Sequence, residues 1–326
     1  MMDVARVAEA LRSMGVGTVR EQEPLSRHTS FRIGGPASVF VDPDHLDGVV
    51  KVLDWVRDQG LPYFIIGQGT NILVSDRGVE AVVISTVRGL RDFRVEPPVI
   101  TAGSGVLLTK LCRLAEKAGL TGLEFAISIP GTLGGALVMN AGAHGGEMVE
   151  VVESVLVWDA VKGVHRIDAA EAQFQYRQSR FMKNPWIALE AVLRLKPGDP
   201  AETREKMRHN MEYRKKSQPV GEPNAGSIFK NPLPHYAGRL IEQIGAKGWR
   251  EGDAMVSDLH ANFIVNAGSA TARDVLELMR RIRRTVYRET GIVLKPEVRW
   301  IGPGEGGAEA TWENLWYAEG GGLTEP

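Results

Sequence analysis

The sequence predicts a mixed fold of helices and strands that is divided into two or three domains. The chain has 326 residues, more than one typical domain, and 43% of them are hydrophobic, which supports full cores. Short β-branched runs alternate with segments of helical apolar spacing along most of the chain. Two glycine-rich, almost uncharged loops each follow such a run, which suggests a ligand cleft built on this fold.

The first region reads as a helix followed by a βαββ block. Residues 3–14 have helical spacing, and Asp44 is expected to cap a second helix that ends at Gly60. Strands are expected over residues 38–41, 63–66 and 79–85.

The second and third regions are separated by the Pro197-Gly198-Asp199-Pro200 stretch, which reads as a linker. Strands are expected over residues 99–102, 151–158, 165–168, 187–195, 263–265 and 296–301. Helices are expected over residues 107–118, 202–214, 237–244 and 271–289. The tail beyond residue 302 is rich in Gly and Glu and offers only Trp312, Leu315, Trp316 and Tyr317 as docking anchors.

Composition argues against several function classes. The net charge is −1, so no basic surface is expected for nucleic acid or for a membrane. The single cysteine, Cys112, excludes a disulfide framework and has the spacing of a core residue. No leader sequence or long apolar run is found, and no histidine has metal-ligand spacing. We therefore expect a soluble cytoplasmic protein with no metal site.

The two glycine-rich loops are the strongest functional signal. The first runs Gly67, Gln68, Gly69, Thr70, Asn71, Ile72, Leu73. The second runs Ser128, Ile129, Pro130, Gly131, Thr132, Leu133, Gly134, Gly135, Ala136, and is followed closely by Asn140, Ala141, Gly142. Glycine lets the backbone approach a ligand and lets N–H groups converge on an anion, so we expect a long dianionic cofactor. The alternative is a pair of ordinary tight turns.

Three polar clusters are further candidates, each with a structural alternative. Arg177, between Tyr176 and Phe181, fits a carboxylate or pyrophosphate, or is a surface arginine stacked on Tyr176. Ser227 lies in a proline-bounded loop without a nucleophile elbow, so it is a hydrogen-bond or proton donor, or an ordinary turn serine. Glu297, beside Lys295 and Arg299, is a catalytic carboxylate or part of an ion pair. His260 is a ligand contact or a structural histidine.

In combination and order, these segments resemble the UDP-N-acetylenolpyruvoylglucosamine reductase family (UDP-N-acetylmuramate dehydrogenase, MurB). The resemblance covers about residues 29–302. It rests on Thr29-Ser30-Phe31-Arg32-Ile33-Gly34-Gly35, both glycine loops, Tyr176-Arg177-x-Ser179, residues 224–232, His260-Ala261-Asn262-Phe263 and Pro296-Glu297-Val298-Arg299-x-Ile301-Gly302.

The resemblance implies an α+β fold. Two FAD-binding subdomains of the vanillyl-alcohol-oxidase (PCMH) type are expected over residues 1–88 and 89–198, a substrate-binding α/β domain over residues 199–302, and a tail of unknown role over residues 303–326. It also implies that NADPH reduces non-covalently bound FAD, which then reduces UDP-N-acetylglucosamine enolpyruvate to UDP-N-acetylmuramate. This reaction belongs to peptidoglycan synthesis, and with it to cell shape and division. A monomer is expected.

The resemblance also implies roles for residues. Ser227 is the proton donor, and Arg177 and Glu297 flank the reacting carboxylate. The expected cofactor-binding residues are Gly67, Gln68, Gly69, Thr70, Asn71, Ile72, Leu73, Gly103, Ser104, Ser128, Ile129, Pro130, Gly131, Thr132, Gly134, Gly135, Asn140, Ala141 and Gly142. The expected substrate-binding residues are Tyr176, Arg177, Lys215, Lys216, Asn231 and His260.

Two features depart from the usual pattern of the family. Only fifty residues separate Tyr176 from Ser227, as in a shorter, type II subgroup that lacks an extra substrate lid. Ser217 stands where many members have lysine before Gln-Pro, so Lys215 or Lys216 is expected to take over its contact with the substrate diphosphate. Two alternatives remain open: another FAD-dependent oxidoreductase of the same superfamily, or a non-catalytic protein that binds a UDP sugar or flavin.

Overall fold

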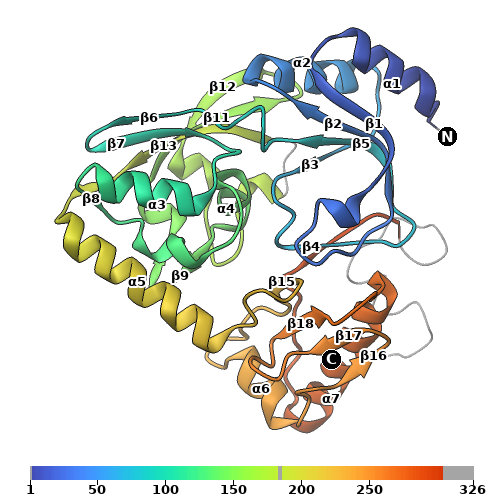
Figure 1. Ribbon diagram of the computed structural model, residues 1–326, viewed down its shortest axis with the longest axis vertical. Coiled ribbons are helices and arrows are strands. Elements are labelled where there is room, and N and C mark those ends of the chain that lie inside the picture. The colour runs from blue at the N-terminus through green and yellow to red at the C-terminus, as the bar shows by residue number, and fades with distance from the viewer. Residues whose placement is uncertain (1, 183–185, 304–326) are drawn as a thin grey trace. The chain divides into compact units, whose positions relative to one another are not determined.

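The computed structural model describes residues 2–182 and 186–303, and the chain forms two compact units (Figure 1). The first unit consists of Met1–Glu21, Val39–Gln68 and Ala81–Lys216. The second consists of Gln22–Ser38, Gly69–Glu80 and Ser217–Pro326. The tail residues Trp312, Leu315, Trp316 and Tyr317 lie outside the described residues. No helix within residues 2–182 and 186–303 combines the length and the hydropathy needed to cross a bilayer.

The predicted N-terminal block is confirmed. One four-stranded sheet has the order β1-β2-β5-β3. Its strands are β1 (Gly17–Pro24), β2 (Pro36–Pro43), β3 (Tyr63–Ile66) and β5 (Val79–Ser85). Helices α1 (Val4–Ser13) and α2 (Leu46–Asp58) lie on one side of it (Figure 1). Their buried side chains, such as Leu11 and Leu53, join a core with Val39, Val82 and Ile84 from the strands.

The two helices begin at different kinds of cap. Asp3 caps α1 as its carboxylate accepts from the Arg6 amide at 3.1 Å. The predicted cap of α2 at Asp44 is wrong, because His45 Nδ1 accepts from the Gly48 amide at 2.9 Å instead. The Asp44 carboxylate is engaged elsewhere, 2.6 Å from Arg88 Nη2, and is therefore not available to the helix.

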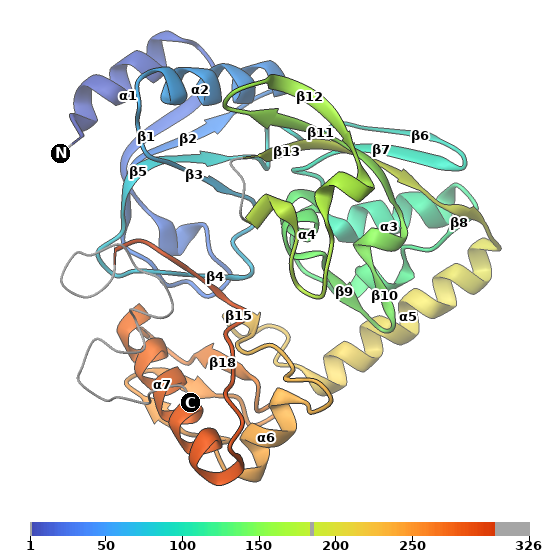
Figure 2. The ribbon, with the colours of Figure 1, turned by 180° about the vertical axis from the view of Figure 1, so that it is seen from behind.

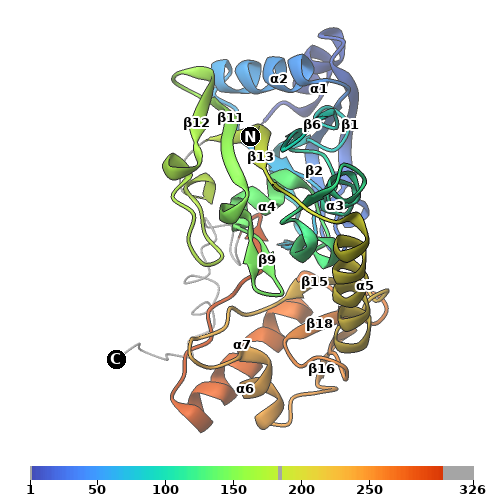
Figure 3. The same ribbon diagram turned by 90° about the vertical axis from the view of Figure 1, so that its left-hand side faces the viewer.

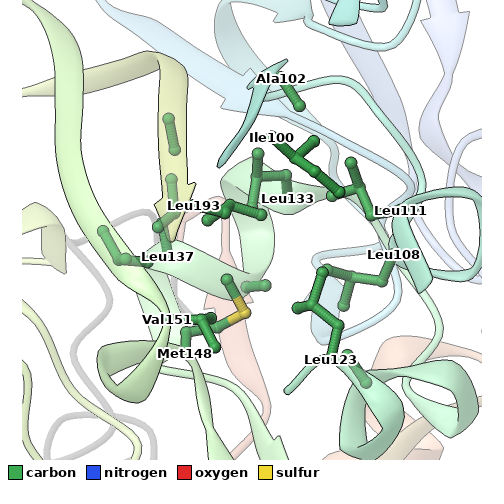
Figure 4. Packing of buried hydrophobic residues seen from close by; sticks show 14 of the residues in the cluster. Ile100, Ala102, Leu108, Leu111, Leu123, Leu133, Leu137, Met148, Val151 and Leu193 are labelled. Carbon is green, nitrogen blue, oxygen red and sulfur yellow. The ribbon is translucent and has the colours of Figure 1, made fainter. Parts of the chain in front are cut away.

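An antiparallel sheet of order β12-β11-β13-β7-β6 organises the rest of the first unit. Its strands are β6 (Phe93–Glu96), β7 (Val99–Gly103), β11 (Val152–Asp159), β12 (Gly163–Asp168) and β13 (Ile187–Arg194). Helices α3 (Leu108–Lys117) and α4 (Leu133–Met139) pack on it. Figure 4 shows Ile100 and Leu193 of the sheet meeting Leu108, Leu133 and Leu137 of these helices.

Short elements complete this unit. Two-residue strands pair as β8 (Leu120–Thr121) with β14 (Lys196–Pro197) and β9 (Gly142–Ala143) with β10 (Gly146–Glu147). Single 3₁₀ turns lie at Glu124–Ser128, Met148–Glu150, Ala169–Ala172 and Arg180–Met182, and a further one at Leu25–Arg27 belongs to the second unit. Cys112 is a core residue as predicted: its thiol donates to the Leu123 carbonyl, and burial raises its pKa to about 12.

Helix α5 (Pro200–Ser217) starts at the last residue of the expected linker and packs with the first unit (Figure 3). Met207 joins the core of that unit, Arg204 pairs with Glu116 at 2.6 Å, and Asn210 donates to the Glu124 carbonyl at 2.9 Å. The first unit therefore extends to Lys216, beyond the expected boundary at residue 198. The division into three domains stays a prediction.

The second unit is built on a sheet of order β15-β18-β17-β16 with two helices (Figure 2). The strands are β15 (Asn224–Ser227), β16 (Arg250–Glu251), β17 (Ala254–Val256) and β18 (Phe263–Asn266), and the helices are α6 (Ala237–Gln243) and α7 (Ala272–Thr290). Strand β19 (Arg299–Ile301), shorter than predicted, runs parallel to β4 (Ile72–Val74). Phe31 and Leu73 from the early segments are fully buried in the same core.

The amino end of α7 is capped from two places in the sequence. Thr271 and Asp274 form a reciprocal capping box. The Asp76 carboxylate also accepts from the Ala272 amide at 2.8 Å and the Arg273 amide at 3.1 Å. These amides have no partner within the helix, and a negative charge beside them is favourable. Asp76 thus anchors the 69–80 segment to the helix.

Replacing Asp76 with alanine is expected to lower the free energy of unfolding by about 1–2 kcal/mol, the usual value of a helix cap. Thermal unfolding of Asp76→Ala and of Asp58→Ala measures this, because Asp58 forms only an exposed ion pair with Arg57. Equal melting temperatures for the two variants would show that the cap contributes nothing.

Candidate active site

The two glycine loops meet within the first unit. Gly67 directly follows β3, and a Cβ built on it would lie 2.6 Å from Thr132 Oγ1 in the second loop. The Gly134 amide donates to the Ser104 carbonyl at 2.7 Å, and a Cβ on Gly134 would lie 2.9 Å from Ser104 Cβ. Gly67 with Thr132, and Gly134 with Ser104, four residues predicted to bind a cofactor, therefore pack closely because the glycines have no side chain.

Gly135 differs from the other loop glycines. It is exposed, and a Cβ on it would meet no atom closer than Thr132 Oγ1 at 3.9 Å. Packing among the described residues thus does not explain the glycine at this position. The second loop also contains helix α4, which its glycine content did not predict: Thr132 caps the helix by accepting from the Gly135 amide at 3.4 Å.

Asn140 and the residues beside it end α4. Asn140 is fully buried with φ of +41°, and its amide donates to the Gln175 carbonyl at 3.2 Å and accepts from the Val149 amide at 3.0 Å. Its side chain is therefore engaged by the protein, so a cofactor contact there would be made by the backbone. The remaining predicted cofactor residues of this unit, Ser128 to Pro130 and Ala141 to Gly142, flank the same helix.

His144 lies on the hairpin between β9 and β10. Its Nε2 lies 3.0 Å from Ser128 Oγ, and its ring packs edge-on against Tyr213 with centroids 5.6 Å apart. Burial lowers the pKa of His144, and the nearby His209 and Arg214 charges lower it further. His144 is therefore neutral at pH 7. Its ring holds the hydroxyl of Ser128, the first residue of the second glycine loop.

Arg177 occupies a tight turn whose ends, Gln175 and Gln178, exchange backbone hydrogen bonds. Its φ is +53°, a left-handed conformation that is unusual for a residue with a side chain. Its Nη2 donates to the Gly142 carbonyl at 2.6 Å, and its guanidinium stacks on the exposed Tyr176 ring at 5.1 Å. The stacking given as the structural alternative for Arg177 is present, and the arginine also binds the carbonyl of Gly142, shortly after the end of α4.

Ser227 and Glu297 are brought together within the second unit although 70 positions separate them. The Glu297 amide donates to the Ile228 carbonyl at 2.8 Å, and Phe229 forms a bridge with Pro296. Ser227 ends β15, is half-buried, and its hydroxyl makes no hydrogen bond with a described residue. The serine hydroxyl is thus available to a ligand beside the backbone of the glutamate.

The second half of the first glycine loop supports this pair. The side-chain Nδ2 of Asn71 donates to the Glu297 carbonyl at 3.3 Å. The backbone amide of Arg299 donates to the Asn71 backbone carbonyl at 3.0 Å. The Ser30 hydroxyl donates to the Asn224 carbonyl at 2.6 Å, while the Ser30 amide donates to the Gly69 carbonyl at 3.1 Å. Residues 69–73 therefore belong structurally to the segments that carry Ser227 and Glu297.

The cations beside Glu297 do not form the ion pair that the sequence left open. Neither Lys295 nor Arg299 makes an ion pair with a residue of the described ranges, 2–182 and 186–303. The Arg299 guanidinium is half-buried, and burial lowers its pKa. An uncompensated, partly desolvated cation is a candidate for binding an anion. Arg299 was not among the predicted site residues, although the expected strand over residues 296–301 would place it on the same face as Glu297.

The predicted substrate-binding residues fall into two groups. In the first unit, Lys215 and Lys216 end α5, are exposed, and make no ion pair with a described residue. In the second unit, Asn231 Oδ1 accepts from the Ala237 amide at 3.0 Å, which leaves its NH₂ group for a ligand. His260 Nδ1 accepts from the Asn262 amide at 3.2 Å, and burial lowers the pKa of His260, so the neutral ring carries its proton on Nε2.

No group of three or more His, Cys, Asp or Glu residues within residues 2–182 and 186–303 is arranged to hold a metal ion.

Two family descriptions match the chain. Residues 218–301 match the C-terminal domain of UDP-N-acetylenolpyruvoylglucosamine reductase, and residues 37–168 match an FAD-binding domain. The first range coincides with the C-terminal segment of the second unit, and the second lies almost wholly in the first unit.

Relatives match over nearly the whole chain. A UDP-N-acetylenolpyruvoylglucosamine reductase of Anoxybacillus flavithermus is 45% identical over 91% of this chain and 99% of its own length. A second such reductase, from Symbiobacterium thermophilum, is 47% identical over 90% of this chain and 96% of its own. The crystal structure of the Thermus caldophilus reductase (MurB) is 36% identical, superposes with a TM-score of 0.76, and covers 87% of this chain and 100% of that one. The predicted α+β class with an FAD-binding part and a C-terminal domain is thereby confirmed. The chain belongs to the UDP-N-acetylenolpyruvoylglucosamine reductase family.

Proposed function

We propose that this chain carries out the reaction of its family with Ser227, Arg177 and Glu297 at the reacting centre. The chain is an FAD-containing, NADPH-dependent oxidoreductase that converts UDP-N-acetylglucosamine enolpyruvate to UDP-N-acetylmuramate in peptidoglycan synthesis. The observation that supports the assignment of residues is the backbone pairing that places Glu297 beside Ile228, next to a serine hydroxyl with no partner among the described residues.

The glycine loops fit a flavin dinucleotide. Backbone N–H groups of such loops bind pyrophosphate, and the open space beside Gly135 admits a ligand. FAD, when bound, takes hydride from NADPH and supplies it to the enolpyruvyl carbon. Attachment is non-covalent: His144 Nε2 is already paired with Ser128, and Cys112 is buried. We propose that the residues predicted to bind FAD do so, with Asn140 contributing only its backbone.

The protein's own residues act on the charge that develops in the substrate. Hydride addition to the terminal carbon leaves negative charge on the carbon next to the carboxylate and on the carboxylate oxygens. The Arg177 guanidinium stabilises this charge where it develops. The Ser227 hydroxyl then gives its proton to that carbon and regains one from solvent. Glu297, two residues before β19, orients these groups.

The remaining side chains bind the non-reacting part of the substrate. Lys215 and Lys216 supply positive charge for the diphosphate, since Ser217 cannot. The NH₂ group of Asn231 and the Nε2 proton of His260 act as hydrogen-bond donors, and Tyr176 offers an exposed ring. We further propose that the protein acts as a monomer in the cytoplasm, without nucleic-acid or membrane partners.

Adding a side chain at Gly135 tests the cofactor site. Because a Cβ there meets no close atom, Gly135→Val should leave the melting temperature of the FAD-free protein within about 2 °C, roughly 1 kcal/mol or less. The FAD content of the purified variant, measured from its visible absorbance, should fall sharply. Full FAD occupancy would remove Gly135 from the cofactor site.

Replacing Ser227 with alanine separates the two half-reactions. The variant should bind FAD and be reduced by NADPH at a near-normal rate, because no carbon is protonated in that step. Its reoxidation by the enolpyruvyl substrate should slow by at least about 10²–10⁴-fold, measured by anaerobic stopped-flow absorbance. Ser269→Ala, at an exposed serine of the same unit, is the control. Equal slowing of both half-reactions would exclude the proton-donor role.

Replacing Arg177 tests the guanidinium. Arg177→Ala should lower kcat by about 10²–10³-fold. Arg177→Lys keeps the charge but loses the planar fork and the bond to Gly142, so it should restore only part of the activity. Arg180→Lys is the matched control, because Arg180 also stacks on an aromatic ring, that of Trp186. Near-normal turnover in Arg177→Ala would leave Arg177 as a stacked surface residue only.

A further inference from the structure

Asn262 is a buried polar residue to which neither the family resemblance nor the proposed chemistry gives a role. It immediately precedes β18, only 4% of it is exposed, and it lies in the His260-Ala261-Asn262-Phe263 motif. A buried amide is costly unless it is hydrogen-bonded, so its contacts indicate what it does.

Both ends of the Asn262 side chain bind the backbone of one residue. Its Oδ1 accepts from the Phe229 amide at 3.0 Å, and its Nδ2 donates to the Phe229 carbonyl at 2.8 Å. Its own carbonyl accepts from the Ile228 amide at 2.9 Å. The asparagine therefore replaces a rung of the β-ladder, directly after the point where Ser227 pairs with Phe263.

On the opposite side, the same short segment is held by residues 296–297, just before β19. Phe229 bridges to Pro296, and the Ile228 carbonyl accepts from the Glu297 amide. Phe229 is itself 1% exposed, so its amide and carbonyl have no access to water if Asn262 releases them. Without both bonds the backbone must shift to find other partners, and Ser227 lies only two residues away.

We propose that Asn262 is a positioning residue that fixes the backbone between Ser227 and Glu297 and thereby sets where the serine hydroxyl lies. The proposal rests on the proposed function, in which Ser227 donates a proton to the substrate. An amide is suited to this task because it presents one donor and one acceptor at a fixed spacing. Aspartate keeps the acceptor for the Phe229 amide but places an oxygen against the Phe229 carbonyl.

Asn266 provides a matched control at the other end of β18. It is also buried, at 7% exposure, and both ends of its amide are bonded. Its Nδ2 donates to the Phe31 carbonyl at 3.2 Å, and its Oδ1 accepts from the Gly268 and Ala270 amides. None of these bonds reaches residues 227–229. Asn266→Asp therefore makes the same chemical change in the same strand without touching the serine segment.

The test compares Asn262→Asp with Asn266→Asp in the FAD-loaded protein. For Asn262→Asp, we expect reduction by NADPH within about twofold of the unchanged protein and reoxidation by the enolpyruvyl substrate slowed roughly 10–100-fold, since a displacement of about 1 Å can cost 10²-fold. The loss should lie in kcat and not in KM. Equal kinetics for the two aspartate variants would overturn the proposal, as would slowing of both half-reactions.

A second variant covers the case in which Asn262→Asp does not fold. Asn262→Ser keeps a donor and an acceptor on one shorter, neutral side chain. It should fold and bind FAD, and it should slow reoxidation less than the aspartate variant does where both can be measured. Unchanged reoxidation in a folded Asn262→Ser protein would overturn the proposal, because its hydroxyl is too short to bridge both Phe229 groups.

The double variant Ser227→Ala/Asn262→Asp shows whether Asn262 acts through the serine. If it does, the second change slows reoxidation no more than about twofold beyond Ser227→Ala alone. If the rate losses of the two single variants multiply in the double variant, Asn262 has an effect independent of Ser227, and the proposal is overturned. Failure of the proposed function is distinguishable, since it appears in Ser227→Ala by itself.

Discussion

The hydrogen bond from the Glu297 amide to the Ile228 carbonyl joins the two segments on which the proposed chemistry depends. Around it, Phe229 bridges to Pro296, and the Lys230 amide donates to the Lys295 carbonyl at 2.8 Å. These contacts are made by the backbone. The two segments are thus joined through their backbones, and the Ser227 hydroxyl makes no hydrogen bond with a described residue.

The early segments of the chain complete this framework because they are folded into the second unit. Residues 22–38 and 69–80 belong to the same compact unit as the C-terminal residues, although their neighbours in the sequence belong to the first unit. Ser30 contacts both Gly69 and Asn224, and Asn71 contacts the backbone at Glu297 and Arg299. As a result, the second half of the first glycine loop is fixed by the same contacts that hold the segments of Ser227 and Glu297.

Local signals predicted most elements and few of the contacts between them. Helices with a side-chain cap at Asp3 or Thr271 were found within two residues, since capping and apolar spacing are encoded in adjacent positions. Helix α4 was not predicted, because its glycines read as a loop. The cap of α2 was assigned to Asp44 because the competing partner, Arg88, lies far away in the sequence.

For the candidate site too, the sequence predicted the residue types but few of the contacts between them. Its residue types were predictable from motif order, through the family resemblance, and the proximity of Ser227 to Glu297 is consistent with that resemblance. The sequence could not show that Asn140 is consumed by backbone partners, that Arg299 lacks an acidic partner among the described residues, or that Asn262 completes the ladder at Phe229. Each of these features depends on a pairing between residues 9 to 35 positions apart or on burial, and local spacing in the sequence encodes neither.

The backbone of Arg177 shows how a charge can be set in place before the substrate arrives. Its left-handed conformation costs of order 1 kcal/mol or more, and such conformations persist where the surroundings impose them. Here the surroundings are the Gly142 carbonyl, which holds the guanidinium, and Asn140, which is itself left-handed and holds the turn at Gln175. The two strained residues support each other. The guanidinium is thus oriented by contacts outside its own turn. In the proposed reaction, it would stabilise the developing negative charge with little reorganisation.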